Sequence, residues 1–537
     1  MARPTLYTPE LFKEYQDKGY WQSATFSDLW DRNAREIPDK EAVVDSTTRL
    51  TWSQANLWIT RLALKFADLG LKKDDMVAVQ LPNSVDLPLV RIACERAGLL
   101  CTPIQRNFRH KEMEYILRYV EAKAVVIPCE FRGFNYFDMV QQIKTNLPAL
   151  KHIILTGDQT RDGTLSFDAI VHDPIETTYP ADYLKSRSTP AEEYSLVMPT
   201  SGTTGFPKLV EQPICSRHYM ARVYLGVFGV TGSDRIAVLS PAPSGPNAVA
   251  YFGAPQAGAA IIMQERFEAG EALRLIEKEK ITFLSIVPTQ IYMLVDHPDF
   301  GKYDHSSVRL VWTGAAPLNF DLASQAEEKF GCPIVQSYGL IDAGGVAISS
   351  RGDPREVRLR TVGKPMPGNE VRLDDGEIVV RGPVFVSGYY KDPETTSRLW
   401  SKEGWYTTGD LGRFDERGNL MIVGRKKDTI KRGGQNIYPI EVENLLLTHP
   451  SVTGAAVVGM PDPVMGERAC AYVSVKKGER FTFDEMIAFL KENNLAPFKL
   501  PERLEIAGEL PQTGEHKIDK KALQQDIIAK LKAEGKG

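Results

Sequence analysis

A short stretch of hydroxyl side chains, glycines and one lysine is the part of the sequence best suited to hold phosphate groups. It spans residues 198–208 and directly follows the apolar pair Leu196 and Val197. Glycines let backbone N–H groups approach an oxyanion, hydroxyl groups add donors, and a lysine adds a mobile positive charge. Pro207 precedes Lys208, so the G-x-x-x-x-G-K-[ST] pattern of the Walker loop is not met. The stretch predicts a triphosphate site of another kind; the alternative is a solvated turn.

Four further segments carry side chains suited to a nucleotide, and each is weak on its own. They lie at residues 336–342, 405–410, 424–428 and 511–518. The aromatic ring of Tyr338 can cover a base, Asp342 can hold Mg²⁺, and Asp410, which we expect at a strand end, can accept hydrogen bonds from ribose. On their own, Tyr338, Asp342 and Asp410 are as readily explained as residues of turns. The charged run 424–428 and Lys517 are as readily explained as solvent-exposed residues.

The composition predicts a globular protein with no general affinity for nucleic acid or lipid. The chain has 537 residues, 43% hydrophobic and 25% charged, with a formal net charge of −4. This length predicts about two to four domains, and the charge gives no global basic field. The 6 cysteines form no C-x-x-C pair, so we expect neither a zinc site nor a disulfide framework. Without a signal-peptide core or an apolar run of about 20 residues, we expect a cytoplasmic protein with no membrane or nucleic-acid partner.

The hydrophobic pattern predicts an α/β fold with a smaller C-terminal unit. From about residue 76 to residue 155, and again over 236–337, short apolar runs alternate with helical periodicity, which indicates parallel sheets covered on both faces. From about residue 362, short alternating segments predict a β-rich unit. We therefore expect a large N-terminal domain of two α/β subdomains plus a small β-rich subdomain, followed after residues 424–428 by a small α+β C-terminal domain.

Taken together and in order, these segments resemble the adenylate-forming (ANL) superfamily of acyl-CoA synthetases, aryl-acid–AMP ligases and luciferases. The resemblance covers nearly the whole chain, including connecting residues 361–368, 381–390 and 433–439. Within the superfamily, 2-hydroxyisobutyryl-CoA ligase is a candidate relative. It implies that Mg·ATP and a carboxylic acid give an acyl-adenylate and pyrophosphate, after which a thiol displaces AMP. Positioned cations and amides suffice for such chemistry, without a nucleophilic side chain.

The resemblance assigns nucleotide-binding roles to matching residues. The phosphates would be held by Thr200, Ser201, Gly202, Thr203, Thr204, Gly205 and Lys208. The adenine would lie against Tyr338 and Gly339, with Gly314, Ala315, Ala316 and Pro317 on its other side. Asp342 would hold the metal, and Asp410 and Arg425 the ribose.

The resemblance also implies a mobile C-terminal domain, 427–537, that turns relative to an adenylation domain, 1–426. Lys517 would touch both the substrate carboxylate and the α-phosphate in the first step. Lys427 would be the hinge, and rotation would then bring Lys431, Gly433 and Gly434 to the coenzyme A tunnel. Lys517 and Lys431 are the predicted catalytic residues.

The sequence departs from the family pattern at positions that bear on the metal and on the acid. Ile341 and Asp342 replace a Thr-Glu pair, His516 replaces a glycine, Ala315 replaces a frequent glycine, and residues 241–247 lack a frequent histidine. The added methyl narrows the pocket. The predicted acid-binding residues are Ser244, Asn247, Trp312 and Gly339. The side chains of Ser244 and Asn247 can bind a substrate hydroxyl. We therefore expect a small acid that is either short and branched, with or without a 2-hydroxyl group, or aromatic.

Two acceptors and one non-catalytic role remain open. Residues 434–443 resemble CoA ligases, whereas residues 19–83 resemble aryl-acid–AMP ligases that load carrier proteins. We favour coenzyme A because the first segment lies nearest the thiol in the family. A non-catalytic acyl or nucleotide sensor is the third reading, and the resemblance leaves a homodimer open.

Overall fold

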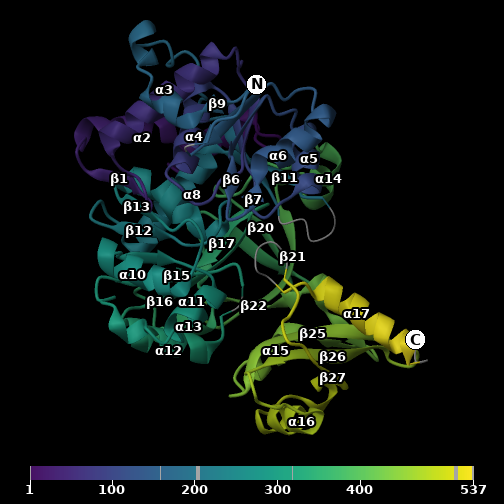
Figure 1. The fold of residues 1–537 in the computed structure, drawn as a ribbon. Helices are drawn as coiled ribbons and strands as arrows, with labels where there is room; N and C mark the ends of the chain where they lie inside the picture. Colours follow the sequence, from purple (N-terminus) through teal and green to yellow (C-terminus); the bar gives the residue numbers. More distant parts are fainter. Residues whose placement is uncertain (1, 158, 201–205, 317, 513–517, 535–537) are drawn as a thin grey trace.

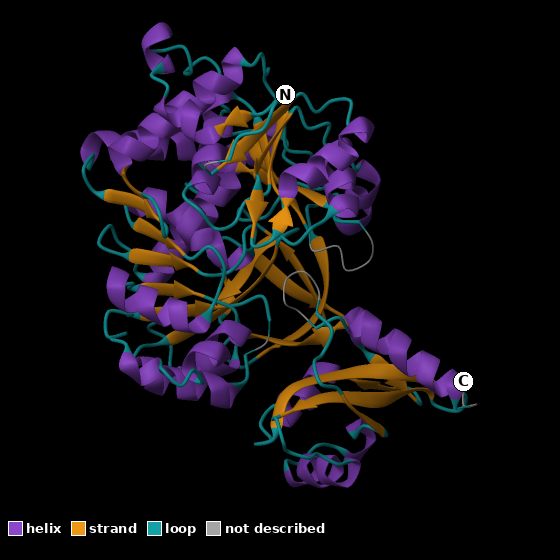
Figure 2. Cartoon of the chain, viewed as in Figure 1, coloured by secondary structure: helices purple, strands orange, loops and turns teal. Residues whose placement is uncertain are grey.

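The computed structural model describes residues 2–157, 159–200, 206–316, 318–512 and 518–534, which form two large sheets, two smaller ones and a two-stranded ribbon of β6 (Glu130–Phe131) and β7 (Phe134–Asn135) (Figures 1 and 2). Helices cover the large sheets, so the predicted α/β class is confirmed. Within these residues no helix is long and apolar enough to cross a bilayer.

The first large sheet has seven strands and carries at its edge residues 198–208, the stretch predicted to hold phosphate groups, which we call the phosphate-loop segment. Its order is β11 (Leu209–Pro213), β10 (Tyr194–Pro199), β4 (Leu100–Pro103), β3 (Met76–Val79), β5 (Ala124–Pro128), β8 (His152–Thr156) and β9 (Leu165–Ser166). All neighbours are parallel except β10 and β11, which form an antiparallel pair. Helices α4 (Asp86–Ala97), α5 (His110–Tyr119), α6 (Tyr136–Ile143) and α7 (Phe167–His172) connect the strands. The strands are short and apolar because a doubly covered parallel sheet buries both faces.

The second large sheet has nine strands. Its order is β18 (Lys364–Pro365), β17 (Gly344–Ile348), β16 (Ile334–Leu340), β15 (Leu310–Thr313), β14 (Phe283–Ser285), β12 (Arg235–Val238), β13 (Ala260–Met263), β1 (Glu41–Val44) and β2 (Arg49–Thr51). Helices α10 (Ala269–Glu279), α11 (Pro288–Val295), α12 (Phe320–Phe330) and α13 (Arg355–Arg360) belong to this subdomain. The N-terminal strands β1 and β2, with α1 (Pro9–Asp17), α2 (Phe26–Glu36) and α3 (Trp52–Asp68), precede the region in which the pattern predicted elements.

Helices α4 and α8 (Ile214–Phe228) lie in the main hydrophobic core, which contains side chains from both large sheets. In α4 every residue from Leu87 to Ala97 is buried, so the helix is covered all round. This placement explains why both helices lack a clean polar face. It also buries charged side chains, among them Arg91 and Arg96 on α4 and Arg217 on α8.

The four-stranded sheet is antiparallel and the five-stranded sheet is mixed, and both belong to the C-terminal part of the chain. The four-stranded sheet consists of β19 (Glu370–Asp374), β20 (Glu377–Arg381), β21 (Tyr406–Phe414) and β22 (Leu420–Arg425). The last sheet contains β23 (Ile430–Arg432), β24 (Gln435–Ile437), β25 (Val452–Asp462), β26 (Gly466–Val475) and β27 (Arg503–Ile506), with helices α15 (Pro439–Leu446), α16 (Phe483–Glu492) and α17 (Lys520–Ala533). Figure 1 shows this unit set apart from the rest. Its two hydrophobic clusters contain only its own residues, as expected of an independent core.

Candidate nucleotide and acid site

A buried carboxylate joins the end of one large sheet to the small antiparallel sheet. Asp410 accepts a hydrogen bond from Tyr338 Oη at 2.6 Å and pairs with Arg425 Nε at 3.1 Å. Burial raises the pKa of Asp410, whereas Arg425 and the Tyr338 hydroxyl lower it. Burial and then Asp410 raise the pKa of Tyr338. The three predicted base and ribose residues therefore lie together around one carboxylate.

Asp410 does not end a strand, contrary to the expectation from the sequence. It lies within β21, where it is the register partner of Arg425 on β22, next to an irregularity between Leu411 and Gly412. β21 continues because it pairs with β20 on one side and β22 on the other. The pairing fixes the guanidinium beside the carboxylate.

The described ends of the phosphate-loop segment are tied to each other. Thr200 N donates to Lys208 O at 2.8 Å, and Lys208 N donates to Thr200 Oγ1 at 3.0 Å. Lys208 Nζ lies 4.8 Å from the ring centroid of Tyr389, a cation–π distance. The predicted residues Ser201, Gly202, Thr203, Thr204 and Gly205 lie outside the described residues.

A tyrosine holds the carboxylate predicted to bind metal. Tyr389 Oη donates to Asp342 Oδ2 at 2.8 Å. The described residues contain no cluster of three or more His, Cys, Asp or Glu side chains suited to a metal ion. One carboxylate fits Mg²⁺ that arrives with a triphosphate, because Mg²⁺ commonly takes one or two protein carboxylates and completes its shell with phosphates and water.

The segment predicted to cover the base follows β15 and contains a strained residue. Ala315 has φ +67°, in the left-handed region that favours glycine. A Cβ on Gly314 would lie 3.0 Å from Ser337 O, so a side chain there would crowd the neighbouring strand. Ala316 is exposed and Pro317 lies outside the described residues. An alanine at position 315 therefore costs on the order of 1 kcal/mol relative to an unstrained backbone.

An aromatic wall lies beside this segment. Trp312 is buried, donates from Nε1 to Ser337 Oγ at 2.9 Å, and lies 5.1 Å from the Tyr224 ring. Gly339 on β16 pairs with Gly345 on β17. Two of the predicted acid-binding residues, Trp312 and Gly339, thus lie on the adjacent strands β15 and β16.

The other two predicted acid-binding residues lie in the loop after β12. Asn247 is fully buried, and its Nδ2 donates to Ser240 O at 3.0 Å and to Pro241 O at 3.4 Å. Asn247 Oδ1 and Ser244 Oγ have no hydrogen-bond partner among the described residues. The Asn247 amide nitrogen is committed to holding the loop, which leaves these two oxygens for a ligand or water.

The predicted hinge and thiol-acceptor residues lie at the junction and on β23. Lys427 is part of a short 3₁₀ turn, Lys426–Asp428, between β22 and β23. Lys431 is exposed, and its backbone N–H donates to Glu467 Oε2 at 2.8 Å. Gly433 and Gly434 have φ of +53° and +83°, which explains the glycine pair. The predicted catalytic Lys517 lies outside the described residues.

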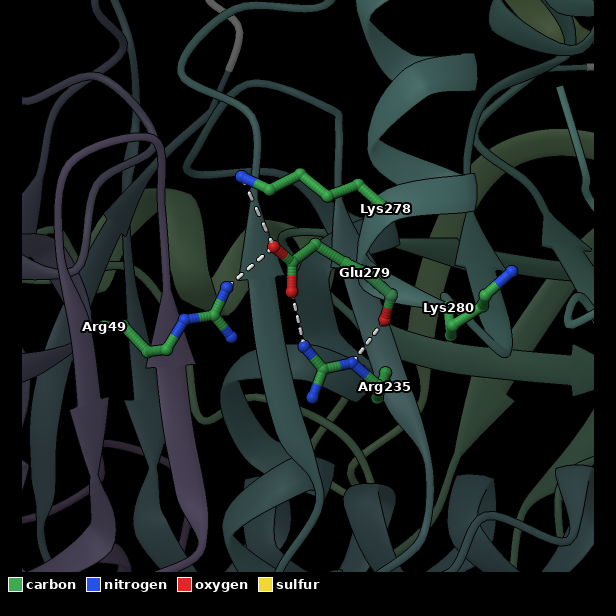
Figure 3. Close-up of a pocket in the computed structure, with 5 residues that line it drawn as sticks. All are labelled: Arg49, Arg235, Lys278, Glu279 and Lys280. Atoms are coloured by element: carbon green, nitrogen blue, oxygen red, sulfur yellow. Dashed lines mark hydrogen bonds and ion pairs between the residues drawn. The ribbon is translucent and has the colours of Figure 1, made fainter.

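A hollow of about 440 Å³ on the second subdomain is a structural ion-pair cluster away from these residues (Figure 3). Glu279 is buried and lies 2.7 Å from Arg49 Nη2 and 2.6 Å from Arg235 Nη2. These pairs connect the N-terminal hairpin to β12 and α10. Because the guanidinium groups are already neutralised, we assign the hollow no ligand.

Sequence patterns did not predict roles for Tyr389 or for Tyr224. Tyr389 lies in the segment 381–390 that carried part of the resemblance, so the segment was noted but not the side chain. Tyr224 lies on a helix with no chemical motif. Their roles depend on contacts between residues far apart in the chain.

Comparison with known proteins gives the same family along almost the whole chain. The model of the AMP-binding enzyme family matches residues 30–390, and that of the AMP-binding enzyme C-terminal domain matches residues 441–517. The 2,3-dihydroxybenzoate-AMP ligase of Bacillus subtilis is 32% identical over 98% of this chain and 98% of that protein. The 2-hydroxy-7-methoxy-5-methyl-1-naphthoate–CoA ligase of Streptomyces carzinostaticus is 31% identical over 96% and 95%. ATP-bound MatB from Rhodopseudomonas palustris superposes with a TM-score of 0.83 at 25% identity, covering 94% of this chain and 99% of that one. The resemblance noted from the motifs is confirmed.

Proposed function

The chain belongs to the AMP-binding enzymes, and on that premise we propose that it is an AMP-forming acid–thiol ligase that activates a small carboxylic acid with Mg·ATP and passes the acyl group to coenzyme A. The observation that carries this proposal is the buried Asp410 carboxylate between Tyr338 and Arg425. A carboxylate beside an aromatic ring suits a nucleoside, because the ribose hydroxyls can donate hydrogen bonds to the carboxylate and the base can stack on the ring.

In the first step an oxygen of the substrate carboxylate attacks the α-phosphorus of ATP, and the bond to pyrophosphate breaks. Two anions must approach each other, so the protein supplies positive charge on both sides. Lys208 and the segment 200–205 would hold the β- and γ-phosphates, and Lys517 would bridge the carboxylate and the α-phosphate. Asp342, held by Tyr389, would bind the Mg²⁺, which neutralises phosphate charge.

In the second step the sulfur of coenzyme A attacks the acyl carbonyl carbon, and AMP leaves. Lys517 has to leave the path of the thiol, which supports a turn of domain 427–537 about Lys427. Lys431, Gly433 and Gly434 would then meet the thiol. The small acid would lie against Trp312 and Gly339, with Ser244 and Asn247 at its edge.

A second candidate differs from this proposal in the thiol acceptor and in the acid, and the relatives give it specific support. Full-length relatives include both an aryl-acid–AMP ligase and an aryl-acid–CoA ligase. An aromatic acid loaded onto a phosphopantetheinyl carrier protein is therefore the second candidate. Both candidates share the adenylation step.

The proposal is tested by acid-dependent exchange of labelled pyrophosphate into ATP over a panel of short branched, hydroxylated and aromatic acids. Exchange with at least one small acid supports it. Adding coenzyme A or a phosphopantetheinyl carrier to the preformed adenylate then identifies the acceptor. No exchange with any acid, from folded protein supplied with Mg²⁺, would favour a non-catalytic sensor.

Replacing Tyr389 by phenylalanine is expected to raise the Mg²⁺ concentration that gives half-maximal pyrophosphate exchange by about tenfold. A hydrogen bond to a charged group contributes about 1.5–3 kcal/mol, and the variant removes the bond by which Tyr389 orients Asp342. Titration of Mg²⁺ at fixed ATP measures the change. Tyr390→Phe is the matched control, because its ring packs against Tyr194 instead. Equal curves for wild type and Tyr389→Phe would contradict the positioning role.

Replacing Lys431 by alanine is expected to impair thioester formation by about tenfold or more and to leave pyrophosphate exchange within about twofold. The side chain is exposed on β23, so its loss should not unfold the domain. Single-turnover assays of the two steps separate the effects. A larger loss in exchange than in thioester formation would remove Lys431 from the second step.

A further inference from the structure

Arg217 on α8 is a buried arginine with no carboxylate partner among the described residues. The residue is 4% exposed. The guanidinium donates to Ser216 Oγ from Nε and Nη2 at 3.3 Å, to Met220 Sδ at 3.4 Å, and to Val384 O. All of these acceptors are uncharged, and a thioether sulfur is a weak one.

The other buried arginines of the described chain are each paired with an acid. Arg91 lies 3.2 Å from Glu95, Arg96 lies 2.8 Å from Asp31, and Arg358 pairs with Glu327. This contrast matters because a buried charge without a counter-ion is costly, whereas a paired one is tolerated.

Arg217 keeps its charge despite its surroundings. Burial lowers its pKa, and the neighbouring groups that oppose this are the phenols of Tyr7 and Tyr224 and the thiol of Cys215, none of which is a carboxylate. An arginine side chain does not deprotonate in proteins, so the guanidinium stays positive. A counter-ion from outside the chain would remove the imbalance.

The position of the guanidinium indicates where that counter-ion would be. A Cβ built on Gly344 would lie 2.9 Å from Arg217 Nη2, so the guanidinium is directly beside the start of β17. Gly344 pairs with Leu340, and the next residue, Gly345, pairs with Gly339, one of the predicted acid-binding residues. Arg217 therefore lies beside the strand pair against which the acid would lie.

Tyr224 connects this position to the aromatic wall. It lies two helical turns after Arg217, which places both on one face of α8. Its hydroxyl would be 3.0 Å from a Cβ on Gly345, and its ring is 5.1 Å from Trp312. A row of neighbouring groups thus leads inward from the base-covering segment: first Trp312, then Tyr224, then Gly345 and Gly344, and finally Arg217.

We propose that Arg217 is a specificity-determining residue that binds a second anionic group at the far end of the acid, so that the substrate is a dicarboxylic acid or an acid with another distal anion. This inference rests on the proposed function. A guanidinium binds a carboxylate through two parallel N–H···O bonds, which the present neutral partners do not provide. The distal anion would replace the sulfur of Met220 as a partner and supply the missing negative charge.

Matched pairs of acids test the inference on the full-length protein. Each pair has the same carbon chain and differs only in the distal group, such as succinate with its monomethyl ester, or isophthalate with its monomethyl ester. We expect kcat/KM in pyrophosphate exchange to be at least about tenfold higher for the dianion of a preferred pair. A sulfonate analogue of that pair distinguishes a requirement for carboxylate from a requirement for negative charge.

Arg217→Met, which keeps the apolar stem, is expected to raise KM for the dianion by about 100-fold with little change in kcat, and to change KM for the monoanion by less than about threefold. Arg217→Lys should recover part of the loss. Arg222→Met is the control: this arginine is on the same helix but binds the carbonyl oxygens of Gly19 and Tyr20. Thermal unfolding checks that each variant is folded.

Equal use of monoanions and dianions by wild type, or an equal loss for both in Arg217→Met, would overturn the inference and leave Arg217 as a brace between α8 and Val384. The wild-type comparison decides the matter even if the variant does not fold. Absence of exchange with every acid would instead overturn the proposed function itself. The two failures are therefore distinguishable.

Discussion

Replacing Lys517 by alanine is expected to slow adenylate formation by about 10²- to 10³-fold while leaving thioester formation from supplied adenylate within about twofold. One positioned charge at the developing negative centre is commonly worth this much in rate. The role comes from the family resemblance, since residues 513–517 lie outside the described part of the chain. Pyrophosphate exchange measures the first step, and single-turnover reaction of synthetic adenylate with coenzyme A measures the second.

Lys520→Ala is the matched control for this variant. Lys520 follows shortly after it in the sequence, at the start of α17, and its Nζ lies 2.6 Å from Glu443 Oε1 within the same C-terminal unit. It should retain both half-reactions. Equal loss of the two steps in Lys517→Ala would show that Lys517 serves the whole cycle or the fold, and would end its assignment to adenylation.

Replacing Asp410 by alanine is expected to raise KM for ATP by about 10²-fold or more. The carboxylate is the proposed acceptor for the ribose hydroxyls, and hydrogen bonds to a charged group contribute about 1.5–3 kcal/mol each. The variant also leaves Arg425 without its partner, but that side chain is 46% exposed and can be solvated. Initial-rate measurements at varied ATP give the change.

Deoxy analogues of ATP sharpen this test. Wild type should discriminate strongly between ATP and its 2′- or 3′-deoxy forms, and Asp410→Ala should discriminate weakly, because the group that senses the hydroxyl is gone. Tyr338→Phe keeps the aromatic ring and loses the bond to Asp410, so a rise in KM of about fivefold is expected. If Asp410→Ala still discriminated between ATP and its deoxy forms as strongly as wild type, Asp410 would not be the group that binds the ribose.

Local patterns predicted the elements whose neighbours are close in sequence or fully buried. Met76–Val79 was recognisable because a strand covered on both faces is a continuous apolar run. The hairpin of β1 and β2 gave no such signal. β1 has four residues and its parallel partner is β13, so its place in the sheet depends on a contact with a distant part of the chain.

The site was predictable as a set of segments but not as a set of contacts. Asp410 and Tyr338 were identified from chemistry and resemblance, yet their hydrogen bond joins residues 72 positions apart. The tyrosine that holds Asp342 is 47 positions away, and the carbonyl that Arg217 binds is 167 away. No periodicity in a single sequence records such pairs, so the positioning side chains needed the three-dimensional structure.

The N-terminal part and the C-terminal unit have separate hydrophobic cores, and this affects how easily the unit can change its orientation relative to the N-terminal part. Each part buries its apolar side chains among its own residues. Among the described residues, the hydrogen bonds across the junction include one from Asn319 Nδ2 to Asn444 O at 3.1 Å and, at the hinge itself, one from Thr429 Oγ1 to Arg425 O at 3.1 Å. Reorienting the unit would therefore exchange surface contacts without opening either interior. Two arrangements of similar free energy are expected, and a bound ligand that favours one of them by a few kcal/mol would set which is populated.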